Sequence, residues 1–589
     1  MGKYEFTRFL NTFHSLGAKN ENAFAETNVT NPLFKKIMVD REVGKHIISV
    51  IAEREPHIFI LTGHAGDGKT ALLIQALHQW NVLKSNSKLL PEDEFLLPNG
   101  KKCTYVKDFS EDILSNQVSK LEKYKNKIAN GEYVFLVANT GPLLAAFEKS
   151  FSPEEQMKLI NAIDENDGVI KVYENVPVAV INVATIDNST FVKPFLDNVL
   201  NENNWKECDF CSKKTSCPIL NNQKIMHKYI SPISDFIVKH YIYQQEYDKK
   251  LTIRQIVAHL TYSITGGLEC EKVLNLTDNS LKSSYFFNYL FTNLFFGYVG
   301  FSINEEARTL KAVSDIIRQG YDEKRLQLDE KLFIKNDLTD IPEEVRCLLK
   351  ESEKWKFKTG DNSSSVDPES AVQKANVKKN AELMSELRQY AIRRAYLLTN
   401  VNTNEKEKRQ LLEDLFSSNY SRFLDLREGM QIGPFEKALV MDALQMLFMG
   451  NIQKNEDIQI TLKRSEDVQQ SVQLGLYSFN SREIELRQEE VNDFNPKKRY
   501  KQYIFVNKIK ITPNLSLPLI NYFNEISRGV ISTNIDPMLS QGIDSLKAQI
   551  MSLCEKGEKL ELLNLSDKGW ISTKAVYDET RSTWTIYER

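Results

Sequence analysis

Short apolar runs alternate with segments of helical periodicity in the N-terminal third of the chain. The runs that fit buried strands cover residues 57–62, 103–106, 133–138 and 178–184. Apolar residues recur at helical spacing over residues 41–55, 70–80, 111–129 and 153–163. Continuous apolar strands that alternate with helices are typical of a parallel sheet covered on both faces. The pattern therefore predicts an α/β layer.

The pattern changes near residue 251, where helical segments begin to follow one another with few strand signals. The aromatic stretch 285–301 includes two asparagines and a threonine and lacks basic flanks, which favours a buried core helix over a membrane span. The serine-rich stretch 358–369 has the composition of a flexible linker or long loop. Helical spacing then resumes and gives way to a mixed pattern with strand-like pieces at 472–477, 483–486 and 503–506.

These changes predict six regions along the chain. We expect a helical lead-in (1–50), an α/β domain (51–250) with a cysteine-rich insert near 205–220, a lid-like helical domain (251–357), a linker or long loop (358–370), a second helical region (371–431) and a mixed α/β C-terminal region (432–589).

The composition of the 589 residues is that of an ordinary folded protein, which excludes a disordered or collagen-like chain. The 79 acidic and 76 basic residues leave a net charge of -3, so bulk attraction to nucleic acid is excluded. One local basic run, Lys497, Lys498, Arg499 and Lys501, fits either a solvated turn or a contact with a phosphate backbone. Seven cysteines argue against a secreted disulfide scaffold, and the first residues lack a signal-peptide pattern. We therefore expect a cytoplasmic protein without a membrane partner.

The most specific pattern is the loop GHAGDGKT, which satisfies G-x-x-x-x-G-K-[ST] between a predicted strand and a predicted helix. Its residues are Gly63, His64, Ala65, Gly66, Asp67, Gly68, Lys69 and Thr70. Glycines let a tight loop turn several backbone N–H groups towards a triphosphate, and the positive end of the following helix favours the same anion. We expect Lys69 to contact the β- and γ-phosphates of ATP and the Thr70 hydroxyl to bind Mg²⁺.

Hydrolysis of the nucleotide requires a further group that holds the attacking or Mg²⁺-bound water, usually a carboxylate at the end of a second strand. The strand over 133–138 is followed by Asn139, an amide, which would contact the γ-phosphate. The alternative is a strand-end turn, because the residue types of Asn-Thr-Gly-Pro are common in turns. The strand over 103–106 is followed by Asp108, which would bind Mg²⁺ or its water, or cap a helix at the surface. The third strand ends near Thr185 and Asp187, which are further candidates to line the site.

An arginine often neutralises the charge that develops on the γ-phosphate in such sites. Arg254 begins a helix predicted over 252–265, directly after the α/β domain, and Arg393 and Arg394 lie on a later predicted helix. The alternative for each of the three is a surface salt bridge, because arginines are common on helices.

Three cysteines, Cys208, Cys211 and Cys217, occur within ten positions. A C-x-x-C pair places two sulfurs on one side of a tetrahedral ion, and Cys217 fits as a third ligand. His227 or a cysteine from elsewhere in the fold would complete the site. Structural zinc is the first interpretation, and an iron–sulfur cluster, a redox pair or unligated loop thiols are the alternatives.

Five segments together resemble a known family. They are GHAGDGKTALL, VFLVANTGPLLAAF, VAVINVATIDNSTFVKPFLDNVL, LTIRQIVAHLTYSITGG and YFFNYLF, in this order. The set is similar to the DptF family, the ATPase-like components of restriction systems that depend on DNA phosphorothioation. In that family a strand ending in Asn-x-Gly follows the P-loop, and a later helical segment carries an arginine and ends in a glycine pair. The matching positions here are Asn139-Thr140-Gly141 and Arg254 with Gly266-Gly267, and the likeness covers about residues 50–300.

The resemblance implies a P-loop NTPase domain of the AAA+ or STAND-like kind, followed by helices. It also implies an ATP-binding and ATP-hydrolysing component of bacterial antiphage defence, which restricts unmarked DNA together with partner subunits. A nuclease constellation does not stand out in the sequence, so DNA cleavage would belong to a partner. One alternative is a nucleotide-dependent switch that forms homo-oligomers and recruits an effector without contacting DNA. Another is a nucleotide-binding scaffold with no ATPase activity.

Overall fold

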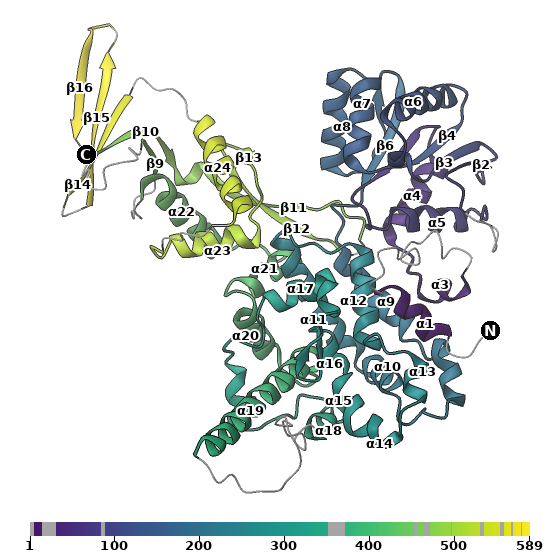
Figure 1. Cartoon of the computed structure of the whole chain (residues 1–589). Helices are drawn as coiled ribbons and strands as arrows, with labels where there is room; N and C mark the ends of the chain where they lie inside the picture. The colour runs from purple at the N-terminus through teal and green to yellow at the C-terminus, as the bar shows by residue number, and fades with distance from the viewer. Residues whose placement is uncertain are drawn as a thin grey trace. The chain divides into compact units, whose positions relative to one another are not determined.

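The computed structural model describes residues 5–14, 31–83, 89–351, 371–450, 452, 457–462, 472–495, 497–530, 535–553, 559–566, 569–578 and 580–588 (Figure 1). The described chain divides into two compact units. The first comprises Met1–Leu415 and Asn492–Pro496, and the second comprises Phe416–Val491 and Lys497–Arg589. The second unit begins inside the region 371–431 that we expected to be one helical region, and the expected linker at 358–370 lies outside the described residues.

A six-stranded sheet forms the core of the first unit, in the order β2-β3-β4-β1-β6-β5. The strands are β1 (Ile58–Thr62), β2 (Glu92–Leu96), β3 (Lys102–Val106), β4 (Tyr133–Val137), β5 (Lys171–Tyr173) and β6 (Val176–Asn182). The four central strands β3, β4, β1 and β6 are parallel, whereas β2 and β5 pair antiparallel at the two edges. The four predicted strands and the mostly parallel sheet are therefore confirmed.

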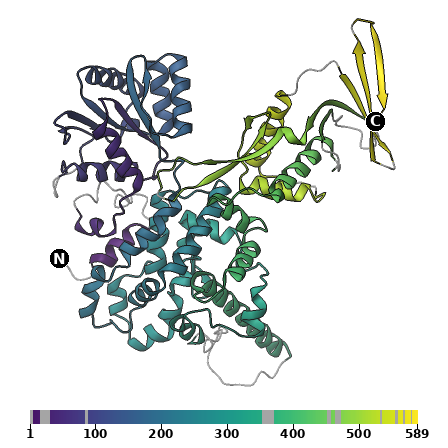
Figure 2. The same ribbon diagram turned by 180° about the vertical axis from the view of Figure 1, so that it is seen from behind.

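Helices cover both faces of this sheet (Figures 1 and 2). On one face, α4 (Glu42–Glu53) and α5 (Lys69–Gln79) pack against alternate residues of β1, such as Phe59 and Leu61. On the other, α6 (Leu114–Ala129), α7 (Thr140–Ser150) and α8 (Pro153–Glu165) pack against Ile58 and Ile60. Because both faces are covered, every residue of β1 is buried, which explains its continuous apolar run.

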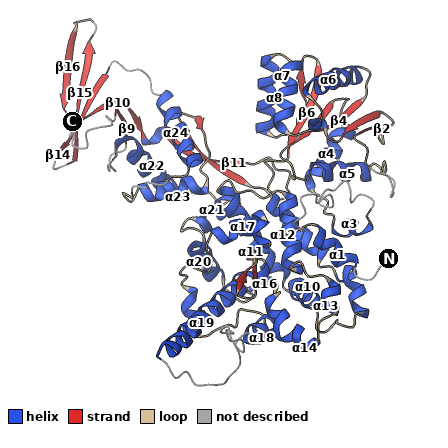
Figure 3. Cartoon of the chain, viewed as in Figure 1, coloured by secondary structure: helices blue, strands red, loops and turns tan. Residues whose placement is uncertain are grey.

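The rest of the first unit is almost entirely helical (Figure 3). Two helices precede the sheet, α1 (Glu5–Thr12) and α3 (Pro32–Ile37). The helices after it are α9 (Val192–Val199), α10 (Pro218–Lys228), α11 (Ile230–Glu246), α12 (Ile253–Thr265), α13 (Cys270–Leu274), α14 (Asp278–Ser280), α15 (Phe286–Asn288), α16 (Phe291–Leu294), α17 (Lys311–Arg318), α18 (Glu343–Glu351), α19 (Ala371–Thr399) and α20 (Glu405–Leu415). A two-stranded hairpin, β7 (Tyr298–Val299) and β8 (Ser302–Ile303), interrupts them. Helices thus begin directly after β6, well before the predicted change at residue 251.

The aromatic stretch 285–301 is buried as predicted, but the prediction of a single helix is wrong. Its residues belong to a π-helical turn (Leu281–Tyr285), to the short helices α15 and α16, and to β7. Phe287, Phe291 and Phe295 are nevertheless all buried, at most 2% exposed. Among the described residues, no helix is both long and apolar enough to cross a membrane.

The second unit combines helices with two antiparallel sheets, ordered β16-β15-β14-β10-β9 and β11-β12-β13. Its strands are β9 (Asp457–Leu462), β10 (Val472–Asn480), β11 (Ile484–Glu490), β12 (Tyr500–Val506), β13 (Ile509–Ile511), β14 (Lys559–Ser566), β15 (Gly569–Asp578) and β16 (Thr583–Glu588). Its helices are α21 (Tyr420–Arg427), α22 (Pro434–Met449), α23 (Leu517–Ile526) and α24 (Pro537–Ser552). The three predicted strand-like pieces fall in β10, β11 and β12, and α22, α23 and α24 pack with β11 and β12 in one core.

Candidate nucleotide-binding site

The glycine-rich loop connects the central strand β1 to α5, at the carboxyl edge of the parallel strands. Gly66 and Gly68 have φ angles of 89° and 86°, a backbone conformation that side chains rarely allow. A Cβ atom on Gly66 would also lie 3.1 Å from the Thr252 hydroxyl oxygen. The glycines of the motif are therefore required by the path of the loop, and α5 begins immediately after Gly68.

Asp67 and Arg41 hold the loop in shape. The buried Asp67 carboxylate accepts a hydrogen bond of 2.9 Å from the His64 N–H, across the turn. The Arg41 guanidinium donates to the Asp67 carbonyl oxygen (3.1 Å) and to the Asn188 side-chain oxygen (3.3 Å). Burial lowers the pKa of Arg41 to about 10, so that the guanidinium remains charged at neutral pH. Arg41 precedes the motif by more than twenty positions, and no pattern in the sequence indicated it.

Lys69 is held by three acceptors. Its ammonium group donates to the carbonyl oxygens of Gly63 (2.9 Å) and His64 (2.8 Å) and to the Asn139 side-chain oxygen (2.8 Å). An ammonium group has three donors, so these contacts use all of them. Burial lowers the pKa of Lys69, while the negative charges of Asp67 and Asp108 act in the opposite direction. Lys69 must therefore exchange at least one of these contacts to bind a phosphate.

Asn139 and Asp108 follow the neighbouring strands β4 and β3 and lie at the same edge as the loop. The backbone N–H of Asn139 donates to the Ser110 hydroxyl (2.6 Å), and Asn139 immediately precedes α7. The alternative interpretation of Asn-Thr-Gly-Pro as a strand-end turn is therefore wrong, because Gly141 and Pro142 lie in the first helical turn, where a proline needs no N–H partner. The Asp108 carboxylate lies 3.2 Å from the Lys107 ammonium group, and its side chain is 27% exposed.

Arg254 joins the loop to the helical part of the first unit. Its backbone N–H donates to the Gly66 carbonyl oxygen (3.2 Å), and its positive charge lowers the pKa of Lys69. The helix α12 begins here with a capping box, in which the Thr252 hydroxyl and the Gln255 side chain bond each other's backbone N–H groups. The start of α12 is therefore fixed directly against the glycine-rich loop.

These residues border one cavity of about 280 Å³, close to the lower end of the usual range for small-molecule sites, about 300–1,000 Å³. All five predicted catalytic residues line it: Lys69, Thr70, Asp108, Asn139 and Arg254. Ala65, Gly66 and Gly68 of the loop also line the cavity. Gly63, His64 and Asp67 do not belong to the described lining, but their hydrogen bonds stabilise the loop. Much of the remaining lining is apolar and comprises Phe13, Phe34, Ile37, Met38, Val39, Phe191, Phe195, Ile253 and Val257.

Several other candidates lie elsewhere. Thr185 bonds Asn182 and Asn166, and the buried Asp187 accepts from the Ser189 N–H; neither belongs to the described lining of the cavity.

Arg393 and Arg394 form ion pairs of 2.8 Å with Asp329 and 2.7 Å with Asp322. Both arginines are buried, at 5% and 1% exposure, so a surface salt bridge is the wrong description for them. They stabilise the helical part of the first unit instead.

The basic run in the second unit is partly neutralised. Lys497 and Lys498 pair with Glu428 and Glu490 at 2.8 Å, and Arg499 is buried at 8% exposure. These contacts favour the interpretation of the run as part of the folded unit over a contact with a phosphate backbone.

The three clustered cysteines line a second, small cavity of the first unit, and Cys270 joins them. His227, the other proposed ligand, is exposed, lies 3.9 Å from Glu202 and does not belong to the described lining. The described residues contain no group of three or more His, Cys, Asp or Glu side chains that could hold a metal ion as they stand.

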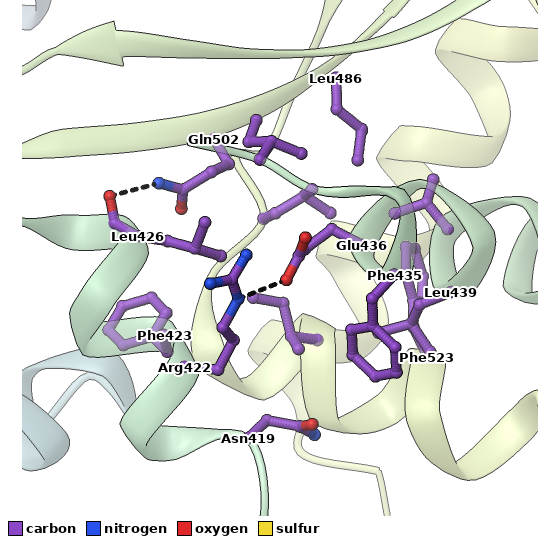
Figure 4. A pocket seen from close by; sticks show the side chains of 14 residues that line it. Asn419, Arg422, Phe423, Leu426, Phe435, Glu436, Leu439, Leu486, Gln502 and Phe523 are labelled. Atoms are coloured by element: carbon purple, nitrogen blue, oxygen red, sulfur yellow. Dashed lines mark hydrogen bonds and ion pairs between the residues drawn. The ribbon is translucent and has the colours of Figure 1, made fainter. Parts of the chain in front are cut away.

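A third cavity, of about 30 Å³, lies within the second unit (Figure 4). Its walls are largely apolar, and its polar groups bond one another: Arg422 pairs with Glu436 at 2.6 Å, and Gln502 donates to the Leu426 carbonyl oxygen at 3.1 Å. A cavity of this size holds only one or two waters, which indicates a packing gap rather than a ligand site.

No protein-family model, curated protein or solved structure matches the chain. The interpretation of the site therefore depends on its own residues.

Proposed function

We propose that the chain binds ATP with Mg²⁺ in the cavity of about 280 Å³ and hydrolyses it to drive a conformational step. One observation carries this proposal: a complete G-x-x-x-x-G-K-[ST] loop opens into a cavity that also contains Asp108, Asn139 and Arg254. A glycine turn with an incidental Lys-Thr pair would not gather these groups from β3, β4 and α12.

The polar end of the cavity suits a triphosphate. Backbone N–H groups of the loop and the positive end of the α5 dipole favour an anion there. Lys69 would exchange a carbonyl contact for the β- and γ-phosphates, and the Thr70 hydroxyl would bind Mg²⁺. Arg41 keeps the loop in the conformation that this binding requires, through the Asp67 carbonyl oxygen.

The apolar side chains of the cavity lining suit a flat nucleobase. Its side chains come from the segment before α4, from α9 and its approach, and from α12, so that three parts of the first unit would enclose the base. Burial of an aromatic ring among apolar side chains would supply affinity, while the phosphate contacts would fix its orientation.

The groups for hydrolysis are assigned by position. Asp108 and Glu111 are the carboxylates in the described lining of the cavity, and we assign Asp108, the nearer to the end of β3, to the water that Mg²⁺ holds. Asn139 is assigned to the γ-phosphate, because its side-chain oxygen already accepts from Lys69 while its amide N–H₂ can donate to a phosphate oxygen. Arg254 supplies positive charge for the transition state.

The sheet is proposed to be a P-loop NTPase domain of the AAA+ or STAND-like kind. Three features support this finer assignment. The loop follows the central strand β1, Asp108 and Asn139 follow β3 and β4 at the same edge, and the helical region is bonded to the loop through Arg254.

The proposed biological role is that of the ATP-dependent component of a bacterial DNA-restriction and antiphage defence complex. The ordered segments shared with the DptF family support it, and partner subunits would then supply DNA contact and cleavage. The contact between Arg254 and Gly66 would couple a bound nucleotide to the position of the helical region. A nucleotide would shift that position if it bound two arrangements of the helical region with different affinity.

A nucleotide-dependent oligomerising switch is the second candidate. Asn139, an amide, follows β4, which lies directly beside the loop strand, and this favours a site that senses the γ-phosphate and hydrolyses it slowly. Both candidates share the nucleotide site and differ in their need for DNA.

The first test is equilibrium dialysis of the full chain against ATP, ADP and GTP, with and without Mg²⁺. Saturation at one ATP per chain supports the proposal, and no saturable binding of any nucleotide overturns it. The rate of phosphate release and the solution mass, each measured with and without DNA and partner subunits, then separate the candidates. Stimulation by DNA supports the restriction role, whereas an ATP-dependent change in mass that ignores DNA supports the switch.

A further inference from the structure

Four thiols, three from one short segment and one from far along the chain, line one small cavity in the first unit. Cys208 lies in the 3-10 helix η4 (Glu202–Phe210), Cys211 follows that helix, and Cys217 immediately precedes α10. Cys270 is the first residue of α13, far along the sequence. All four are free cysteines, and Lys214, Leu220, Val273 and Leu274 complete the lining. Four thiols that converge in this way are more than a chance feature of core packing.

The backbone around these sulfurs is arranged to stabilise thiolates. The Cys211 N–H donates to the Cys208 carbonyl oxygen (3.2 Å), which closes the C-x-x-C turn, and the Lys213 N–H donates to the Cys211 sulfur (3.4 Å). Backbone N–H groups of Ile219 and Leu220, at the start of α10, donate to the Cys217 sulfur. N–H groups that point at a sulfur favour its charged form, which is the form that binds metal.

The charge around the cavity fits a bound tetrathiolate. Four thiolates and one divalent cation carry a net charge of −2, which requires compensation. Lys214 lines the cavity, and the positive charge of Lys224 acts on the Cys217 thiol. Lys213, which donates its N–H to Cys211, pairs with Asp278 at 2.8 Å. Lys214 pairs with Asp209 at 2.8 Å, so the lysines near the cluster offset only part of its negative charge.

We propose that Cys208, Cys211, Cys217 and Cys270 bind one zinc ion, with Cys270 as the ligand that completes the tetrahedron. The sulfurs are not in ligating positions as they stand, so the proposal includes a rearrangement of these side chains when the ion binds. On binding, the four thiols lose four protons to solvent and form four Zn–S bonds.

The size of the cavity selects a single ion over an iron–sulfur cluster. Its volume is about 20 Å³, which is sufficient for about one water-sized particle. A four-iron cluster adds eight atoms inside the same four sulfurs, and it would require the surrounding elements to separate. Zinc prefers four thiolates in a tetrahedron, and the cavity is lined by four thiols.

The zinc would join elements that carry few other links. It connects η4 and α10 to α13, and the neighbouring α1 contributes the Arg8–Glu271 pair (2.6 Å) and the edge-to-face contact of Phe6 with Trp205 (5.3 Å between centroids). The helix α13 follows α12, whose first turn is fixed against the glycine-rich loop. The site is therefore structural and lies outside the nucleotide cavity.

The first test is metal analysis of the full chain, purified under reducing conditions without added metal. We expect one zinc and less than one-tenth of an iron per chain in the wild type, and loss of the zinc in Cys270→Ser. The matched control is Cys347→Ser, an exposed cysteine outside the cavity, which keeps its zinc. A zinc-free wild type, stoichiometric iron, or full zinc retention in Cys270→Ser would overturn the proposal.

The second test needs no variant and covers the case in which Cys270→Ser fails to fold. Thiols of the wild type are alkylated before and after treatment with a zinc chelator, and the modified cysteines are identified by mass spectrometry. Protection of all four thiols until the chelator is added supports the site, while Cys347 reacts under both conditions. If Cys270 reacts equally before and after chelation, it is not a ligand.

Discussion

Replacement of Asn139 by aspartate tests the link between Lys69 and the γ-phosphate. The Asn139 side-chain oxygen accepts from the Lys69 ammonium group at 2.8 Å. In Asn139→Asp the same geometry becomes an ion pair, which holds Lys69 away from the nucleotide and places a negative charge where the γ-phosphate would lie. We expect ATP to bind much more weakly to this variant, and ADP to be affected less.

The size of the effect follows from the distance. Two unit charges 2.8 Å apart attract by about 6 kcal/mol at an effective dielectric constant of about 20. Dehydration of the new carboxylate offsets part of this, which leaves about 2–3 kcal/mol in favour of the nucleotide-free protein. ATP affinity should therefore fall by at least 30-fold to 100-fold, since about 1.4 kcal/mol is a factor of ten. Repulsion of the γ-phosphate, which ADP lacks, should add about a further tenfold for ATP alone.

Asn139→Ala is the matched comparison, because it frees Lys69 without adding charge. Here ADP affinity should stay within about threefold of the wild type, while the preference for ATP over ADP falls by about tenfold through loss of one hydrogen bond to a charged group. Equilibrium titration with fluorescent ATP and ADP analogues measures all four affinities, and circular dichroism checks folding. If Asn139→Asp binds ATP as tightly as the wild type, the assigned contact between this position and the γ-phosphate is wrong.

Three further predictions concern hydrolysis, pH and the buried arginines. Asp108→Asn should lower the rate of Mg²⁺-dependent phosphate release by at least about tenfold while ATP affinity stays within about threefold, and an unchanged rate would exclude Asp108 from hydrolysis. Burial lowers the pKa of His14 and His259 to about 4 and that of His240 to about 3, so these histidines are protonated in the unfolded chain at a higher pH than in the folded chain. The free energy of unfolding should therefore fall as pH drops from 6.5, by roughly 2 kcal/mol per histidine at pH 5. Denaturant titrations at pH 7.5 and 5 with equal midpoints would contradict this. Arg394→Met leaves Asp322 without its partner and should destabilise the fold by about 3–5 kcal/mol without changing ATP affinity in the folded protein, whereas a selective loss of ATP binding would restore Arg394 as a site residue.

The central strands were predictable because burial on both faces leaves an unbroken apolar run in the sequence. The edge strands were not predictable by the same rule. In β2, EDEFL, none of the five residues is buried, and β5 has only three residues. Antiparallel edge strands of this kind take their structure from the neighbouring strand rather than from their own pattern.

The loop and the strand-end residues were predictable because chemistry fixes their spacing and place. Arg41 and Cys270 were not, since each is brought to its partners by the tertiary fold: Arg41 by the start of α4, and Cys270 by the turn between α12 and α13. The start of α7 was misjudged for a local reason. Gly141 and Pro142 are turn residues in isolation, yet both are tolerated in the first turn of a helix.

The central claim is that Lys69 belongs to an ATP site, and the most direct measurement is calorimetric titration of ATP with Mg²⁺ into the wild type, Lys69→Ala and Lys123→Ala. Lys123 is an exposed lysine that pairs with Glu92 and serves as the control. We predict one ATP per wild-type chain, an affinity within twofold for Lys123→Ala, and a loss of about 2–5 kcal/mol, roughly 30-fold to 4,000-fold, for Lys69→Ala. Equal ATP affinity of folded Lys69→Ala and wild type would contradict the account.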